Sequence, residues 1–283
     1  MTSLPSDLTP TVKVATLNLH DAPESYLSRV KAVTEESKQN NVDIIAVQEI
    51  PYEHKDKVIE LFTDAGYVYY QVSGSMVSTR THEKSSATGV FSKHPASKTS
   101  ELNLSARSVT HKSAVLVTEI NNYEIHVIST HFTWGAENGH VRLKEANIMN
   151  DYVLRHQDTP KQLIILAGTL NDTPSADSIR YLTGDKASVD SRESFWVDVT
   201  ENTPLHNLPT TRENSLREAA ARATGVLRPD LVPSRKLDYI LINGWVYGKP
   251  GMPQNPALFG VTTTPEGEDL SDHYGVVTEI WVP

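Results

Sequence analysis

The chain has 283 residues, of which 38% are hydrophobic and 22% are charged, and it contains no cysteine. This composition is typical of a soluble globular protein, and the lack of cysteine excludes disulfide bonds and thiolate metal sites. The formal net charge of -9 argues against tight, general binding to duplex nucleic acid, which normally needs a basic face. No apolar run approaches the roughly 20 residues that would cross a bilayer.

Strand-like and helix-like segments alternate along the whole chain. Alternating or continuous apolar runs predict strands, and apolar residues spaced three to four apart predict helices. The predicted strands are residues 12–19, 43–47, 67–72, 87–92, 113–120, 123–130, 162–167, 236–243 and 274–281. The predicted helices are residues 25–39, 55–65, 140–156, 175–182 and 211–224. We expect Thr173 or Ser175 near the N-cap of the helix at 175–182.

The order of these segments predicts the fold class. Asn121 and Asn122 separate two strands by a dipeptide suited to a tight hairpin, while other strands are connected through helices. This mixture predicts an α+β fold of two packed mixed β-sheets flanked by helices, a four-layer sandwich. We expect residues 1–283 to form a single domain with a flexible N-terminus at residues 1–11. Residues 1–11 lack the features of a secretory signal, so a cytoplasmic location is the default expectation, and secretion stays open if the chain has been trimmed.

Polar residues that folding does not require stand at the ends of the predicted core strands. Each has an ordinary structural interpretation when taken singly, as a turn former or the solvated start of a loop. Their recurrence at successive strand ends predicts a site, because such ends gather at one edge of packed sheets. The residues are Asn18, Gln48, Glu49, Thr130, His131, Gly168 to Asn171, Asp238, Ser271, Asp272 and His273.

The chemistry of this set is coherent. Carboxylate and amide oxygens suit a hard cation such as Mg²⁺, and the two histidines suit proton transfer or the stabilisation of negative charge. The sequence contains no HExxH, GxSxG or P-loop motif, so zinc proteolysis, serine hydrolase chemistry and P-loop nucleotide binding have no support.

Six motifs in order resemble those of the endonuclease/exonuclease/phosphatase family, over residues 12–280. They are TLN at 16–18, DIIAVQE at 43–49, STH at 129–131, GTLN at 168–171, LDYIL at 237–241 and SDH at 271–273. Single motifs such as SDH are weak, but the ordered set is strong. The resemblance implies a deoxyribonuclease-like fold and hydrolysis of a phosphate ester by in-line attack of water, with Mg²⁺ or Mn²⁺ as Lewis acid.

The resemblance also implies a role for each matched residue. Asn18 and Glu49 would hold the metal, and Asp272 would complete the acidic cluster that binds metal or organises water. His131 and His273 would lie at the scissile phosphate. Asn171 would orient the phosphate or the attacking water. Asp238 would hydrogen-bond His273 and fix its tautomer.

Thr169 departs from the family pattern, which reads Gly-Asp-x-Asn where this chain has Gly168-Thr169-Leu170-Asn171. The family's aspartate orients or deprotonates the attacking water, and threonine cannot act as a base near neutral pH. The chain is therefore a natural slow or silenced member, a deliberate inactive variant, or an enzyme with another base. Asp172 and Asp21 are the candidate replacements, although Asp172 is expected to point elsewhere.

Two basic segments have open interpretations. Residues 212–236 hold six arginines and lysines, which indicates either a phosphate-facing loop or a solvated helix with i,i+4 charge pairs. Arg107 and His111, together with Lys112, are candidate substrate-binding residues before the strand at 113–120.

Three classes of function remain open. The first is a metal-dependent phosphodiesterase or phosphomonoesterase, the second is a silenced family member that binds a phosphorylated ligand or nucleic acid, and the third is a non-hydrolytic enzyme that reuses the site. The first is favoured because five of the six motifs are intact. The substrate is a phosphate ester, with nucleotides, single-stranded nucleic acid, small phosphodiesters and phospholipid headgroups all open, and the sequence indicates no partner protein.

Overall fold

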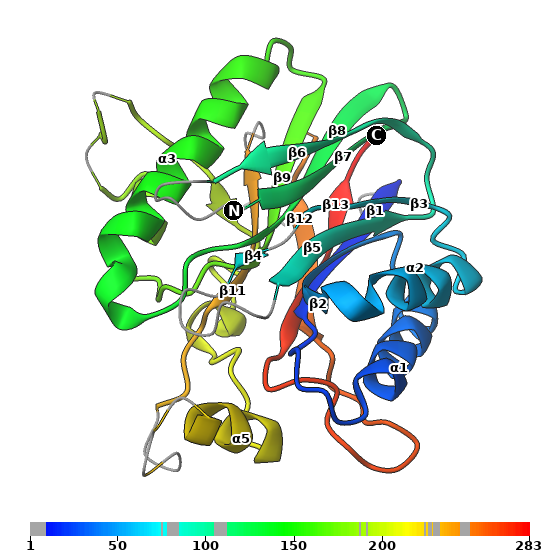
Figure 1. The fold of residues 1–283 in the computed structure, drawn as a ribbon. Helices are drawn as coiled ribbons and strands as arrows, with labels where there is room; N and C mark the ends of the chain where they lie inside the picture. Colours follow the sequence, from blue (N-terminus) through cyan, green and yellow to red (C-terminus); the bar gives the residue numbers. More distant parts are fainter. Residues whose placement is uncertain are drawn as a thin grey trace.

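The computed structural model describes residues 10–74, 76–77, 85–104, 112–186, 188–190, 192–223, 225, 228, 233–243 and 250–283. Two β-sheets lie face to face at its centre, and helices cover both outer faces (Figure 1). The predicted α+β fold of two mixed sheets flanked by helices is therefore confirmed. Of the predicted flexible N-terminus, only Pro10 and Thr11 are described, and Thr11 already pairs with Trp281 in a strand.

The first sheet has the strand order β12-β13-β1-β2-β5-β3, with β4 paired to β5. β1 and β2 are parallel, and the other pairs are antiparallel. The strands are β1 (Thr11–Asn18), β2 (Ile44–Pro51), β3 (Tyr69–Val72), β4 (Met76–Val77), β5 (Ser85–Ser92), β12 (Pro253–Phe259) and β13 (Gly275–Trp281).

The second sheet has the strand order β10-β11-β9-β8-β7-β6, in which only β8 and β9 run parallel. The predicted hairpin joins β7 and β8, and Asn121 and Asn122 take positive φ angles of 52° and 64°, as a tight hairpin of this type requires. The strands are β6 (Ala96–Asn103), β7 (Lys112–Ile120), β8 (Tyr123–His131), β9 (Gln162–Thr169), β10 (Val197–Asp198) and β11 (Asp238–Asn243).

The helices divide between the two sheets. α1 (Tyr26–Gln39) and α2 (Lys55–Asp64) pack on the first sheet, and α3 (Gly139–His156) and α4 (Asp177–Leu182) pack on the second. α5 (Ser215–Ala223) stands apart at one end of the sandwich (Figure 1). Short 3-10 helices are η1 (Tyr52–His54), η2 (Ala136–Asn138) and η3 (Pro204–Asn207). Among the described helices, none has the length and apolar character to span a membrane.

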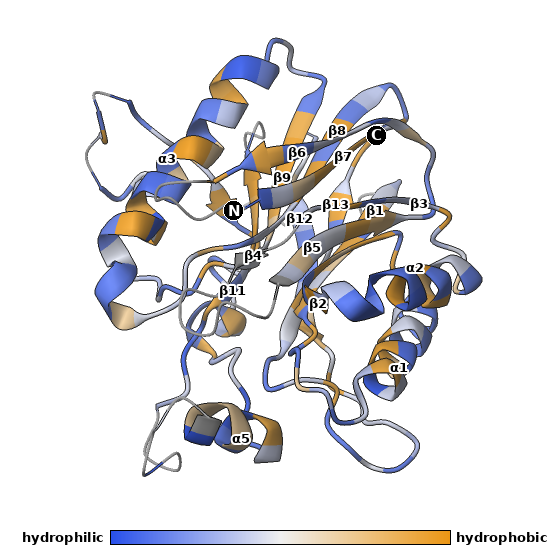
Figure 2. Cartoon of the chain, viewed as in Figure 1, coloured by the Kyte–Doolittle hydropathy of each residue, from blue (hydrophilic) through white to orange (hydrophobic). Residues whose placement is uncertain are grey.

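Alternation along the strands builds three buried layers. In β1, Val12 and Val14 face the second sheet, while Ala15 and Leu17 face α1 and α2. The strands at the centre are covered on both faces, which is why their sequences are continuous apolar runs rather than alternating ones. Figure 2 shows these apolar stretches on the strands, with hydrophilic residues on the connecting loops.

The structure differs from the sequence prediction at a few elements. β6 was not predicted because most of its residues are exposed and polar, and β12 was not predicted because it contains two prolines and a register shift at a sheet edge. α4 begins at Asp177 after Ala176, without a side-chain cap, so the predicted cap at Thr173 or Ser175 is wrong. α5 begins at Ser215 rather than at residue 211.

Candidate active site

The alternation of the central strands carries four polar residues to one end of the space between the sheets. The inward-facing apolar side chains are residues 12 and 14 of β1, 125 and 127 of β8, 163, 165 and 167 of β9, and 240 and 242 of β11. Side chains two residues apart along a strand face the same side, so continuing this alternation to the end of each strand leads to a polar residue. Asp238 and His131 both pair with Thr169 in the sheet. The four residues are Asn18, His131, Thr169 and Asp238.

Glu49 reaches the same place through a bulge. By alternation it would face the helices, like Ile45 and Val47. The register between β2 and β5 shifts between Val47 and Ile50, so that β2 contains one extra residue. Glu49 takes a left-handed φ of 59°, an uncommon conformation for a residue other than glycine that concentrates at functional sites. The bulge therefore redirects the Glu49 carboxylate into the site.

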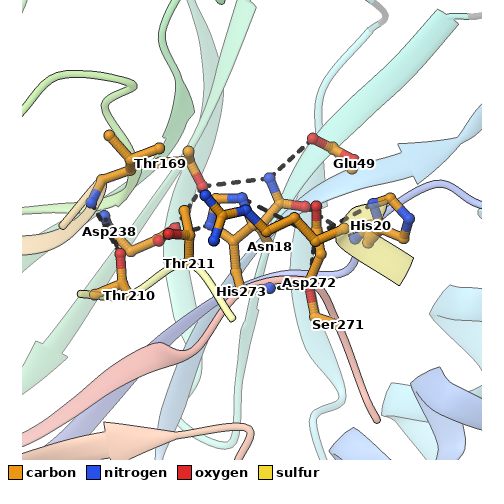
Figure 3. A network of polar contacts seen from close by, with 12 residues as sticks. Asn18, His20, Glu49, Thr169, Thr210, Thr211, Asp238, Ser271, Asp272 and His273 are labelled. Carbon is orange, nitrogen blue, oxygen red and sulfur yellow. Dashed lines mark hydrogen bonds and ion pairs between the residues drawn. The ribbon is translucent and has the colours of Figure 1, made fainter. Parts of the chain in front are cut away.

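Asn18 links Glu49 to the fourth motif. Asn18 Nδ2 donates to Glu49 Oε1 at 2.9 Å and lies 3.4 Å from Thr169 Oγ1. His131 Nε2 lies 3.8 Å from the same Glu49 oxygen. The backbone N–H of Asp21 donates to Glu49 Oε2 at 3.1 Å. These contacts hold the Glu49 carboxylate in one orientation (Figure 3).

Thr169 continues the network to the last motif. Its hydroxyl donates to Asp238 Oδ1 at 2.7 Å, and His273 Nδ1 lies 2.7 Å from Asp238 Oδ2 (Figure 3). Asp238 is fully buried, and its carboxylate contacts these two partners. The Asp238 backbone N–H donates to Thr210 Oγ1 at 3.1 Å. The Asp238 carboxylate therefore links Thr169 to His273.

Asp272 lies between two histidines. Its Oδ1 lies 3.2 Å from His20 Nδ1 and 4.0 Å from His273 Nε2. His20 was not among the residues singled out from the sequence, and the signal for it was a histidine two positions after the Asn18 strand end. His20 is buried, has a φ of 54°, and donates its backbone N–H to Asn18 Oδ1 at 2.9 Å.

The buried charges make this cluster strongly polarised. Burial would lower the pKa of His273, but the charges of Asp238 and Asp272 outweigh it and raise that pKa to about 10. Burial opposes ionisation of Asp272, yet His273 and His20 hold its pKa well below the usual range. His273 is therefore an imidazolium at neutral pH, a suitable group to face a phosphate oxygen.

Helix α1 fixes the loops that carry these residues. Arg29, which is buried, donates from its two terminal nitrogens to four backbone carbonyls, three in residues 19–22 and one at Leu270. Glu36, two turns further along α1, accepts the backbone N–H groups of residues 260–262. The loop after β1 and the loop before β13 are thus tied to one helix.

Other predicted residues lie beside the network or outside the described residues. Asn171 has a φ of 54°, and its Nδ2 donates to the Phe132 carbonyl at 2.8 Å, next to His131. Asp172 is held by Arg142 Nε at 2.8 Å and by Ser178 Oγ at 2.7 Å, which leaves its carboxylate committed away from the cluster. Arg107 and His111 fall outside the described residues.

The arginines of residues 212–236 mostly have partners within the protein. Arg212 pairs with Asp269, and Arg217 donates to the Pro233 carbonyl and to Ser234. Arg222 pairs with Glu218 at i,i+4 spacing. These contacts favour the interpretation of a solvated helix and its loop over that of a phosphate-facing loop.

The donor set fits a hard divalent cation. Glu49 offers a carboxylate and Asn18 an amide oxygen, and Asp272 lies on the other side of His20. Within the described ranges no group of three or more histidine, aspartate and glutamate side chains converges as a metal cage. A site with one or two protein oxygens and several waters is what Mg²⁺ prefers.

A two-sheet sandwich with a polar network of this kind at the strand ends defines a phosphoesterase-type fold. Residues 15–273 match the sequence pattern of the Endonuclease/Exonuclease/phosphatase family, and the chain belongs to that family, whose members are metal-dependent phosphoesterases. No protein with a curated description matches the sequence significantly.

Solved structures of the same fold are similar to this chain at low identity. TDP2 from D. rerio, solved with a single-strand DNA product, has a TM-score of 0.71 and 14% identity, covering 96% of this chain and 99% of the other. TDP2 from C. elegans has a TM-score of 0.69 and 17% identity, covering 98% and 77%. A family member from Bacteroides vulgatus has a TM-score of 0.69 and 14% identity, covering 97% and 100%.

Proposed function

We propose that this protein hydrolyses a phosphodiester or phosphomonoester with a divalent metal ion, at a rate limited by Thr169. The observation that carries the proposal is the unbroken chain of contacts from Glu49 through Asn18, Thr169 and Asp238 to His273. It joins a carboxylate suited to a metal with an imidazolium suited to a phosphate. Both groups lie at the same end of the sandwich.

The residues divide the work of such a reaction between them. Glu49 and Asn18 would hold the ion, and Asp272 would complete the acidic side of the site. A bound Mg²⁺ or Mn²⁺ would supply Lewis-acid stabilisation of charge on the phosphate. His273, kept protonated by Asp238, would donate to a phosphate oxygen during in-line attack by water, with His131 and Asn171 orienting the same group.

Thr169 explains why turnover would be slow. The family places an aspartate there to orient or deprotonate the attacking water. The Thr169 hydroxyl proton is instead directed at Asp238, 2.7 Å away, and a threonine has no proton-accepting function near neutral pH. The loss of a general base typically costs about 10²- to 10⁴-fold in rate.

The same contact supports a second candidate function. A protein that keeps the metal and phosphate ligands but lacks a base would bind a phosphorylated ligand or nucleic acid without turnover. The D. rerio relative was solved with a single-strand DNA product, so single-stranded DNA belongs among the ligands to be assayed.

The test compares the parent chain with its Thr169→Asp and Thr169→Asn variants. Asparagine matches aspartate in size but cannot accept a proton as a base. Each protein is assayed on an aryl phosphodiester, plasmid DNA, single-stranded DNA and a phospholipid, with Mg²⁺, Mn²⁺ or EDTA. We expect Thr169→Asp alone to gain about 10²- to 10⁴-fold in metal-dependent rate. An active parent with no gain in the variant would place the base elsewhere, and inactivity of all three would favour the binding protein.

A further inference from the structure

Two exposed aromatic side chains stand three residues beyond site residues. Trp134 follows His131 at the end of β8 and is 51% exposed, and Tyr52 follows Glu49 at the end of β2 and is 72% exposed. Three residues span at most about 11 Å, so both rings begin close to the site. β2 and β8 belong to different sheets that pack against each other, so the two residues follow strands on opposite sides of the sandwich.

The backbone around Trp134 is held in place by buried side chains. Thr133 donates its N–H and hydroxyl to the Glu145 carboxylate at 2.9 and 2.5 Å. Arg142 donates to the carbonyls of Thr133 and Gly135 at 2.9 and 2.7 Å. Glu145 and Arg142 are almost fully buried. Fixing the backbone that carries an exposed ring reduces the entropy lost when the residue binds a ligand.

The turn after Trp134 needs glycine. Gly135 has a φ of 100°, and a Cβ on it would lie 2.8 Å from Glu137 Oε1 and 2.9 Å from Asn138 Nδ2. The same Asn138 amide donates to the Trp134 carbonyl at 2.6 Å. The turn therefore requires glycine at position 135, and Asn138 fixes the Trp134 carbonyl.

The charge of the chain indicates what such rings would bind. A formal net charge of -9 weakens the case for affinity based on backbone phosphates alone, which dominate most nucleic-acid binding. Affinity for a nucleic acid must then come from its bases, and exposed aromatic rings that stack on unpaired bases are the general means. A choline headgroup would instead call for rings enclosing the cation on several sides.

We propose that Trp134, assisted by Tyr52, is a stacking surface that selects phosphate esters carrying an unpaired nucleobase. This inference rests on the proposed function, because it assumes that the phosphate binds at the proposed site. It does not require that the protein hydrolyses the ester. A base in a duplex is already stacked on its neighbours, so the surface favours single-stranded nucleic acid or nucleotides over duplex DNA. Trp134 is then a specificity-determining residue, outside the network that handles the phosphate.

The test measures binding rather than hydrolysis. Fluorescence anisotropy follows a labelled oligothymidylate and an abasic strand of equal length, both in EDTA, with the parent and three variants. Trp134→Ala is expected to weaken oligothymidylate binding about 5- to 150-fold, the range for loss of one base–aromatic contact, and Tyr52→Ala to weaken it less. Neither variant should change binding of the abasic strand. Phe195→Ala, which removes a ring that is 65% exposed beside β10, is the matched control and should change neither.

Several results would overturn the inference. They are failure of the parent to bind oligothymidylate, equal weakening for the abasic strand, and an effect of Phe195→Ala as large as that of Trp134→Ala. Loss of binding to phosphatidylcholine vesicles, with oligothymidylate binding unchanged, would assign Trp134 to a lipid headgroup instead. The binding assay involves neither metal nor turnover. A failed hydrolysis experiment with Thr169→Asp would therefore not change the conclusion drawn from the binding assay.

Discussion

The substitution Thr169→Asp is expected to destabilise the metal-free protein even though it should raise the rate of hydrolysis. Thr169 and Asp238 are both fully buried, and the Thr169 hydroxyl donates to Asp238 Oδ1. An ionised aspartate at position 169 cannot donate that hydrogen bond. It would also place a second carboxylate beside the first, at a buried position.

The loss of stability can be estimated for two states of the new carboxyl group, ionised and protonated. Two unit charges about 4 Å apart repel by about 4 kcal/mol at an effective dielectric constant near 20. Protonating the new carboxyl at pH 7 costs a similar amount, about 1.4 kcal/mol for each of roughly 3 pH units above its ordinary pKa. The imidazolium of His273 on Asp238 offsets part of the repulsion. We therefore expect a loss of about 2–4 kcal/mol at pH 7, falling to about 1–2 kcal/mol at pH 5, where protonation is easier.

The assay is urea unfolding of the parent and the Thr169→Asp and Thr169→Asn variants at pH 7 and pH 5, with and without Mg²⁺. The aspartate variant should lose stability mainly at pH 7, and Mg²⁺ should recover part of the loss, because a ligand of the native state stabilises it. The asparagine variant should show about the same loss relative to the parent at pH 7 and pH 5, and Mg²⁺ should stabilise it no more than it stabilises the parent. An aspartate variant as stable as the parent at pH 7 without metal, or equally destabilised at both pH values, would refute the reasoning.

Three further outcomes are expected. Lys236→Met should lower the free energy of unfolding by about 3–5 kcal/mol, because Lys236 Nζ lies 2.5 Å from Asp198 Oδ2 and both side chains are almost fully buried. Urea unfolding measures the loss of stability, and a loss below about 1 kcal/mol would contradict this prediction. Glu49→Gln should weaken Mg²⁺ binding by about 10-fold or more, and an unchanged affinity by calorimetry would remove Glu49 from the site. Burial lowers the pKa of His126 below 6.5 despite its contact with Glu124. The unfolded chain therefore binds more protons, and the contribution of His126 to stability should fall as pH drops below about 6.5. A His126→Gln variant should lose that part of the pH dependence, and a variant that retained it would exclude His126 as its source.

Local sequence patterns were sufficient for most of the fold. Strands such as β1 and β9 are apolar runs with β-branched residues, and their extents were predicted to within a residue or two. Where a strand lies at an edge, as β6 and β12 do, it needs no apolar run, and the pattern failed. The predicted N-cap of α4 was wrong because the N-cap residue is Ala176, which has no side chain that could cap the helix.

The candidate site was predictable in membership but not in geometry. Asn18, Asp238 and His273 were recognisable as polar residues at the ends of apolar strands, and the network brings them together. Their roles in binding metal and phosphate stay predictions. His20 was missed. Its one signal was its place two residues after the end of the Asn18 strand, and its contact with Asp272 depends on the tertiary structure.

The sequence by itself determined which segments form strands, which side chains face the space between the sheets, and that Thr169 stands where a base is expected. These properties are local, since alternation along a strand and the chemistry of one residue do not depend on the rest of the chain. Only the tertiary structure decided that a bulge turns Glu49 into the site and that the Thr169 hydroxyl donates to Asp238. It also decided that Arg142 and Glu145 fix the backbone on both sides of Trp134. Those features depend on how two sheets and a buried ion network pack against each other, which no local pattern encodes.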